Sequence, residues 1–260
     1  MRRSLALKLL AGLGVFLPLA LLTSEEGRDL LPETLAAEAL IGGFVYLAKR
    51  RERPRRRSMQ DAAERLGLRF AQDDPFGLLD LPFSLFRFTS ASFGEVTNVL
   101  AGGWRDLQVR VFDYAYSRTE HHVVRLSCAM VAIPGGWPSL TIRPTATLSS
   151  AVGELTGTEI GFESDAFGRA FDVRSEDRRF ASALIDARMI EWLLELAPRA
   201  GFEIRGPWIL AYRAQVQPSE LEEVLSVLDG FIDRIPRAAR SLYPEALPPR
   251  PDRSRGSPSS

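Results

Sequence analysis

The chain has 260 residues, of which 45% are hydrophobic and 25% charged, and its formal net charge is zero. Residues 1–57 carry 11 basic and 6 acidic side chains, whereas residues 58–243 carry 19 basic and 25 acidic ones, a net charge of −6. An acidic domain repels a phosphate backbone, which argues against nucleic acid as a partner. Because Cys128 is the sole cysteine, an intramolecular disulfide and a zinc site of paired cysteines are excluded.

Residues 1–48 predict a membrane anchor made of two transmembrane helices, at about residues 5–22 and 30–48. The first apolar run, Leu5 to Leu22, contains Lys8 as its only charge and would form a helix of about 27 Å, close to the thickness of a hydrocarbon core. The second run, Leu35 to Ala48, carries Glu38 and reaches spanning length only when it is extended back to Leu30. Two alternatives stay open: a cleaved signal peptide for the first run and an interfacial or buried helix for the second.

The orientation of this anchor follows from a basic juxtamembrane segment, residues 49–57. The linker Thr23 to Thr34 holds four acidic residues and one arginine, and basic flanks stay on the cytoplasmic side of a membrane. We therefore expect a helical hairpin in the inner membrane, with the lipid bilayer as a partner and the following domain in the cytoplasm. The orienting residues are Lys49, Arg50, Arg51, Arg53, Arg55, Arg56 and Arg57.

Residues 58–243 predict one domain that begins with a short helix and an aromatic loop. Ser58 can cap a helix over Met59–Leu66, which Gly67 would end. The segment Leu68 to Phe88 contains turn-forming residues and several phenylalanines, and we expect it to cover the core with those rings. Dipping of the same rings into the membrane is the alternative.

Strands are predicted next from alternation of apolar and polar residues. Asn98–Trp104 and Leu107–Ser117 flank a turn at Arg105-Asp106, and the second of them alternates with a period of two. Pro134-Gly135-Gly136 is expected to break the third strand. The remaining predicted strands are His122–Ile133, Leu140–Arg143, Glu159–Glu163 and Phe171–Arg174.

Two amphipathic helices are predicted late in the domain, on either side of a predicted hairpin. The first covers Asp177–Leu196, and the hairpin turns at Gly206-Pro207. The second starts at a capping box of Ser219 and Glu222. The fold class predicted is an α+β, antiparallel sheet-rich cytoplasmic domain behind the transmembrane hairpin, followed by a disordered tail over residues 244–260. The buried stripe expected for the second helix is Leu221, Val224, Leu225, Leu228, Ile232 and Ile235.

One segment carries a family resemblance. Phe162-Glu163-Ser164 is followed by Phe167, Phe171 and Val173. This pattern is similar to that of a family of uncharacterised bacterial membrane proteins, a domain of unknown function with the motif Phe-Glu-Ser-x-x-Phe-x-x-x-Phe-x-Val. Gly168 stands where the family usually has asparagine. The resemblance implies a membrane-anchored domain and brings no agreed activity with it.

The same segment supplies the candidate functional residues. Its aromatic side chains suit core anchors around a tight turn, whereas Glu163, Asp165, Arg169 and Asp172 form a candidate functional cluster that could bind a cation or a substrate. Phosphate-binding loops, nucleophile elbows and zinc-protease motifs are absent from the sequence. Cys128 would lie about 20 Å from His122 along a strand, too far for a nucleophile and its base. We therefore predict no catalytic residue, no metal site and no cofactor.

These observations predict a non-catalytic interaction or sensing module at the cytoplasmic face of a bacterial membrane, with an unidentified protein partner. Two alternatives of other classes stay open. One is a metal-dependent or carboxylate-based hydrolase that uses the acidic residues between Glu159 and Asp172. The other is an apolar-ligand (lipid) binding domain in which the aromatic segment Phe70 to Phe88 forms a lid.

Overall fold

The computed structural model describes residues 54–87, 93–119, 122–145, 157–196 and 199–244. Contacts divide the chain into two compact units, residues 1–57 and 58–260. The predicted transmembrane hairpin and the predicted disordered tail fall outside the described residues. Among the helices that are described, none is both long enough and apolar enough to cross a membrane.

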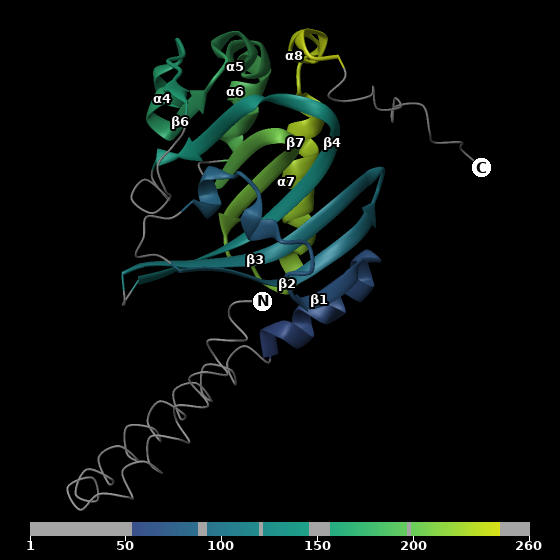
Figure 1. Cartoon of the computed structure of the whole chain (residues 1–260). Coiled ribbons are helices and arrows are strands. Elements are labelled where there is room, and N and C mark those ends of the chain that lie inside the picture. The colour runs from purple at the N-terminus through teal and green to yellow at the C-terminus, as the bar shows by residue number, and fades with distance from the viewer. Residues whose placement is uncertain (1–53, 88–92, 120–121, 146–156, 197–198, 245–260) are drawn as a thin grey trace, which may run out of the picture. The chain divides into compact units, whose positions relative to one another are not determined.

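The second unit is built on an antiparallel sheet of seven strands, with order β1-β2-β3-β4-β6-β5 and β7 paired to β4 (Figure 1). The predicted α+β class, with an antiparallel sheet, is thereby confirmed. The strands are β1 Arg69–Asp73, β2 Phe93–Trp104, β3 Leu107–Thr119, β4 His122–Pro144, β5 Thr158–Glu159, β6 Phe171–Ser175 and β7 Ala200–Ala214. The helices are an unlabelled one over residues 54–66, then α4 Asp165–Ala170, α5 Arg178–Leu184, α6 Ala187–Glu195, α7 Leu221–Arg234 and α8 Arg237–Leu242, with 3₁₀ turns η1 Leu78–Asp80, η2 Ser84–Phe86 and η3 Pro218–Glu220.

Two long strands, β4 and β7, bend together and give the sheet its curvature. The predicted break at Pro134-Gly135-Gly136 is wrong, because β4 runs on through it with a register shift and arches across the top of Figure 1. The predicted hairpin at Gly206-Pro207 is wrong for the same reason: β7 passes through it as one strand. The two irregularities lie side by side, since Trp137 pairs with Gly206. Each is permitted by a glycine in the left-handed region, Gly135 at φ 74° and Gly206 at φ 53°.

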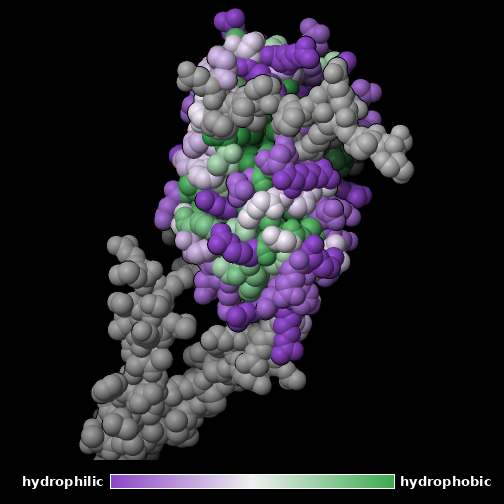
Figure 2. Space-filling view, turned by 90° about the vertical axis from the view of Figure 1, so that its right-hand side faces the viewer, coloured by the Kyte–Doolittle hydropathy of each residue, from purple (hydrophilic) through white to green (hydrophobic). Residues whose placement is uncertain are grey.

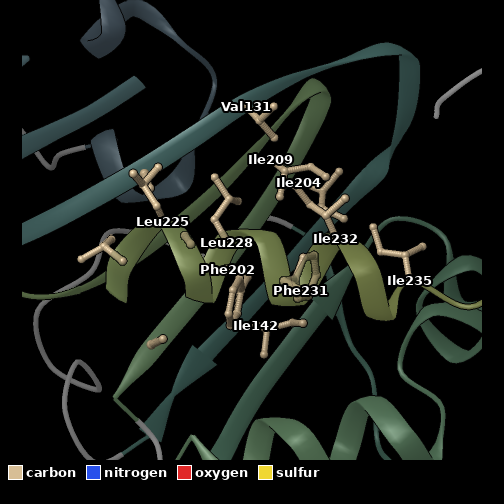
Figure 3. Close-up of a cluster of buried hydrophobic side chains, with 14 of the residues drawn as sticks. Val131, Ile142, Phe202, Ile204, Ile209, Leu225, Leu228, Phe231, Ile232 and Ile235 are labelled. Carbon is tan, nitrogen blue, oxygen red and sulfur yellow. The ribbon is translucent and has the colours of Figure 1, made fainter. Parts of the chain in front are cut away.

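One face of the sheet is covered by helices. Helix α7 lies across β4 and β7, as Figure 3 shows, and Phe231 stacks on Phe202 with ring centroids 4.4 Å apart. The predicted buried stripe of α7 is confirmed. The predicted capping box of Ser219 and Glu222 is wrong, because Gln217 and Glu220 form one at η3, and α7 then begins at Leu221 without a side-chain cap.

The opposite face is covered by the segment 74–87, which we call the aromatic cover. Phe83 and Phe86 are buried there and pack on Phe112 and Tyr114 of β3, so the predicted covering role holds for them. Phe76 is instead 43% exposed and stacks on the guanidinium of Arg110 at 4.3 Å. The central strands bury side chains both under the helices and under the aromatic cover, so their sequences are nearly continuous apolar runs.

The predicted helix over Asp177–Leu196 divides into α5 and α6. Asp177 caps α5 by accepting the N–H of Phe180, and Asp186 caps α6 by accepting the N–H of Met189. Asp186 therefore starts a new helix in the middle of the segment. Its carboxylate accepts a backbone N–H that, in one continuous helix, would bond to a backbone carbonyl oxygen.

The predicted cap at the start of the domain is wrong, because Ser58 lies inside the helix over residues 54–66. Gly67 ends that helix as predicted, at φ 67°.

Candidate functional site

A surface pocket of about 300 Å³ lies where α4 meets β6. Its apolar wall is formed by Ile160, Phe162, Phe171 and Val173. Its polar residues are Glu159, Ser164, Asp165 and Arg169. The pocket therefore combines an apolar wall with carboxylates, a hydroxyl and a guanidinium.

The local sequence explains why the pocket forms. Ser164 caps α4 by accepting the N–H of Phe167, and the short helix ends where β6 begins at Phe171. Phe167 is fully buried and packs edge-on against Phe162 and tilted against Phe171, with centroids 5.3 and 5.2 Å away. The aromatic positions of the Phe-Glu-Ser motif thus anchor a tight turn to the core and hold the pocket wall in place.

The four residues of the candidate functional cluster separate in the structure. Asp165 and Arg169 line the pocket, whereas Glu163 is exposed and lies outside its lining. Asp172 points to the other face of β6, where it pairs with Arg143 at 3.0 Å and with Arg174 at 3.4 Å. Strand alternation separates Asp172 from Phe171 and Val173 and explains the division. In the described part of the chain, no three His, Cys, Asp or Glu side chains gather as a metal site would require.

A second polar cluster lies inside the domain, under the aromatic cover. Glu203 on β7 is fully buried, and its carboxylate accepts the backbone N–H groups of Ser84 and Leu85 at 2.7 and 2.9 Å. Burial raises the pKa of Glu203, against the opposing effects of Arg205 at 3.5 Å and of the two N–H donors. The carboxylate therefore fastens η2 to the sheet.

Arg205 completes this cluster from the same face of β7. Its guanidinium donates to the carbonyl oxygens of Leu140 and Ile204 and to Oγ1 of Thr141 at 2.8 Å. Sequence reasoning missed both charged residues, because Phe202-Glu203-Ile204-Arg205 alternates like a strand with one solvated face. The signal that could have identified them is the aromatic-rich segment 74–87, which needs a face of the sheet to cover.

The groups that would serve as nucleophiles are buried in the same region. Cys128 is fully buried, and burial raises the pKa of its thiol well above the ordinary value, which makes it a poor nucleophile. Burial likewise raises the pKa of Tyr212, whose hydroxyl has no hydrogen-bond partner within the described residues. His121 lies outside the described residues, and the side chain of His122 is not described.

The exposed surface of the described residues offers few large apolar side chains, with Phe76 and Val123 the most exposed of them. Figure 2 shows the face on the right of Figure 1, where small hydrophobic patches are divided by hydrophilic side chains. We therefore take the α4–β6 pocket as the candidate functional site.

Comparison with known proteins gives a fold and no family. No family model matches the chain, and no curated protein matches it. A solved structure that resembles it is the crystal structure of the mycobacterial trehalose monomycolate transport factor A, TtfA. The match has a TM-score of 0.55 at 16% identity and covers 76% of this chain and 98% of that one. At this identity the likeness establishes the fold alone, and the resemblance to the Phe-Glu-Ser family stays a prediction.

Proposed function

We propose that this chain is a membrane-tethered, non-catalytic accessory factor of lipid transport, whose folded domain works at the cytoplasmic face of a bacterial inner membrane. The observation that carries the proposal is the fold shared with TtfA over 98% of that chain. TtfA is named as a transport factor for trehalose monomycolate, a lipid that by its name joins a sugar to an acyl chain.

The N-terminal sequence supports the membrane part of the proposal. Two apolar runs followed by seven basic residues between Lys49 and Arg57 are the pattern of an anchor that leaves the next domain in the cytoplasm. A domain held at the bilayer meets lipid head groups and membrane transporters without diffusing to them. The same basic segment attracts anionic lipid, which would hold the domain close to the surface.

The chemistry of the described residues supports the non-catalytic part. Catalytic groups with shifted pKa values normally face a cleft that substrate can enter. Here Glu203, Tyr212 and Cys128, whose pKa values are raised by burial, lie inside the domain and away from the pocket. The carboxylate-based hydrolase alternative loses Asp172, which two arginines already neutralise.

This function is tested by deleting the gene from the bacterium. Lipids are then extracted separately from the inner membrane and from the layers outside it. We expect one lipid class to accumulate in the inner membrane, and the full chain to restore its distribution. A chain that lacks residues 1–48 should fail to restore it although its domain is intact. An unchanged lipid distribution in the deletion strain would contradict the proposal.

A further inference from the structure

We infer that the α4–β6 pocket binds the sugar head group of a neutral glycolipid. The inference rests on the proposed function, which brings lipid to the domain, and adds a site and a ligand class to it. A volume of about 300 Å³ lies at the lower end of the range for small-molecule pockets, and it suits a head group rather than a whole lipid.

Two of the residues that line the pocket, Gly161 and Gly168, are glycines. A Cβ built at Gly161 or at Gly168 would meet no heavy atom within 4 Å. Neither glycine adopts the left-handed backbone conformation that would make a side chain strained there. A larger residue at either position would thus add bulk to the pocket lining without meeting the rest of the fold at its Cβ.

The charges at the rim select a neutral ligand. Asp165 and Arg169 are exposed at the opening, and neither makes an ion pair among the described residues. Glu159 adds a third charge, with Arg174 4.0 Å away. Together with Arg174, the rim carries two charges of each sign and no net charge, so its electrostatics favour neither an anion nor a cation.

Sugar hydroxyls satisfy both signs of charge at once. A hydroxyl group donates to a carboxylate and accepts from a guanidinium, and Asp165 and Arg169 offer these two functions one helical turn apart on α4. The half-buried ring of Phe162 adds an apolar surface for the C–H face of a pyranose. The polyhydroxylated head group therefore matches the pocket better than a fatty acid or a phospholipid head group does.

The test uses the full chain in lipid nanodiscs and titration calorimetry against empty discs. The probes are hexyl β-maltoside as the uncharged sugar amphiphile, hexanoate as an anion, hexylphosphocholine as a zwitterion, and free maltose. We expect the maltoside to bind and its affinity to fall at least tenfold in Gly168→Leu, which adds bulk to the pocket lining, and at least fivefold in Arg169→Gln. Ser182→Leu, on an exposed position of α5 outside the pocket, is the matched control and should bind as the wild type does.

Each other outcome overturns the inference. Maltoside affinity unchanged in both pocket variants would place sugar binding elsewhere, and binding of hexanoate or hexylphosphocholine with the same sensitivity to Gly168→Leu would refute sugar selection. Equal binding of free maltose would show a site for soluble sugar. No binding of any probe would remove the site, while the lipid distribution of the deletion strain would still decide the proposed function separately.

Discussion

The ring of Tyr212 lies directly against the backbone of Gly201, although both residues belong to β7. A Cβ at Gly201 would lie 2.6 Å from the hydroxyl oxygen of Tyr212 and closer still to its ring. In a straight strand these two residues would be about 36 Å apart. Their contact therefore shows that β7 bends until its two halves face each other, and that the bend closes on the side of the aromatic cover.

Gly201→Ala should accordingly destabilise the domain. The added methyl group meets the ring of Tyr212 inside close packing, and overpacking of this kind costs about 1–3 kcal/mol. Urea unfolding of the full chain measures the change, and Gly161→Ala, where the methyl group enters open space, is the control with an expected change within about 0.5 kcal/mol. Equal stabilities of the two variants would show that the halves of β7 do not meet.

The buried carboxylate of Glu203 predicts a pH dependence of stability. Its pKa is raised above the ordinary value of 4.5, mainly by burial, so the folded domain holds a proton that the unfolded chain has already released. The free energy of unfolding contributed by this group is therefore complete below about pH 4.5 and falls as the pH rises through the folded-state pKa. Glu203→Gln cannot titrate and should lack this fall.

Unfolding of the wild type and of Glu203→Gln, measured in parallel between pH 4 and pH 8, tests this prediction. As the pH rises, the free energy of unfolding of the wild type should fall relative to that of Glu203→Gln. Asp177 contributes with the opposite sign, because a hydrogen bond from Tyr243 lowers the pKa of its carboxyl below 3.8, but it does so in both proteins and cancels. Parallel pH profiles would mean that the pKa of Glu203 is the same in the folded domain as in the unfolded chain.

The sequence predicted those elements whose signals are local. The hairpin of β2 and β3 follows from the alternation of Leu107–Ser117 after a two-residue turn, and Arg105 in that turn adopts φ 54° as a tight turn requires. The buried face of α7 follows from helical spacing alone. In both elements, the residues that determine the structure are neighbours in the sequence.

The elements that sequence reasoning missed depend on partners far away in the chain. Pro134-Gly135-Gly136 and Gly206-Pro207 each have the composition of a turn, but pairing of β4 with β7 on both sides of them carries the two strands through a shared bend. The candidate site was half predicted. Asp165 and Arg169 share a helix and stay together, whereas strand alternation turns Asp172 to the other face of β6, where Arg143 of β4 pairs with it.

The ion pair between Arg105 and Asp229 predicts a measurable coupling between the β2–β3 turn and α7. The guanidinium lies 2.5 Å from the carboxylate of Asp229, which is 3% exposed, and 4.3 Å from the ring centroid of Trp104. Arg105→Ala leaves that buried carboxylate without its arginine and should lower the free energy of unfolding by about 1–3 kcal/mol.

A double-mutant cycle checks this coupling by chemical unfolding. In the Arg105→Ala background, Asp229→Asn removes the charge that has lost its partner, so the double variant should be less destabilised than the sum of the single ones by about 0.5–3 kcal/mol. Strict additivity would show that the turn and the helix are energetically independent.

The predicted anchor is tested by topology reporters fused after Ser260 and, separately, within the linker Thr23 to Thr34. Basic residues between Lys49 and Arg57 should hold the domain in the cytoplasm, so a reporter that works only in the cytoplasm is expected to be active at Ser260 and inactive in the linker. Replacement of the seven basic residues of that run by glutamine weakens the orienting charge and should reduce the difference between the two fusions. An external signal from Ser260 in the wild type would contradict the hairpin, and would move the search for the lipid and for a protein partner from the inner leaflet to the cell envelope.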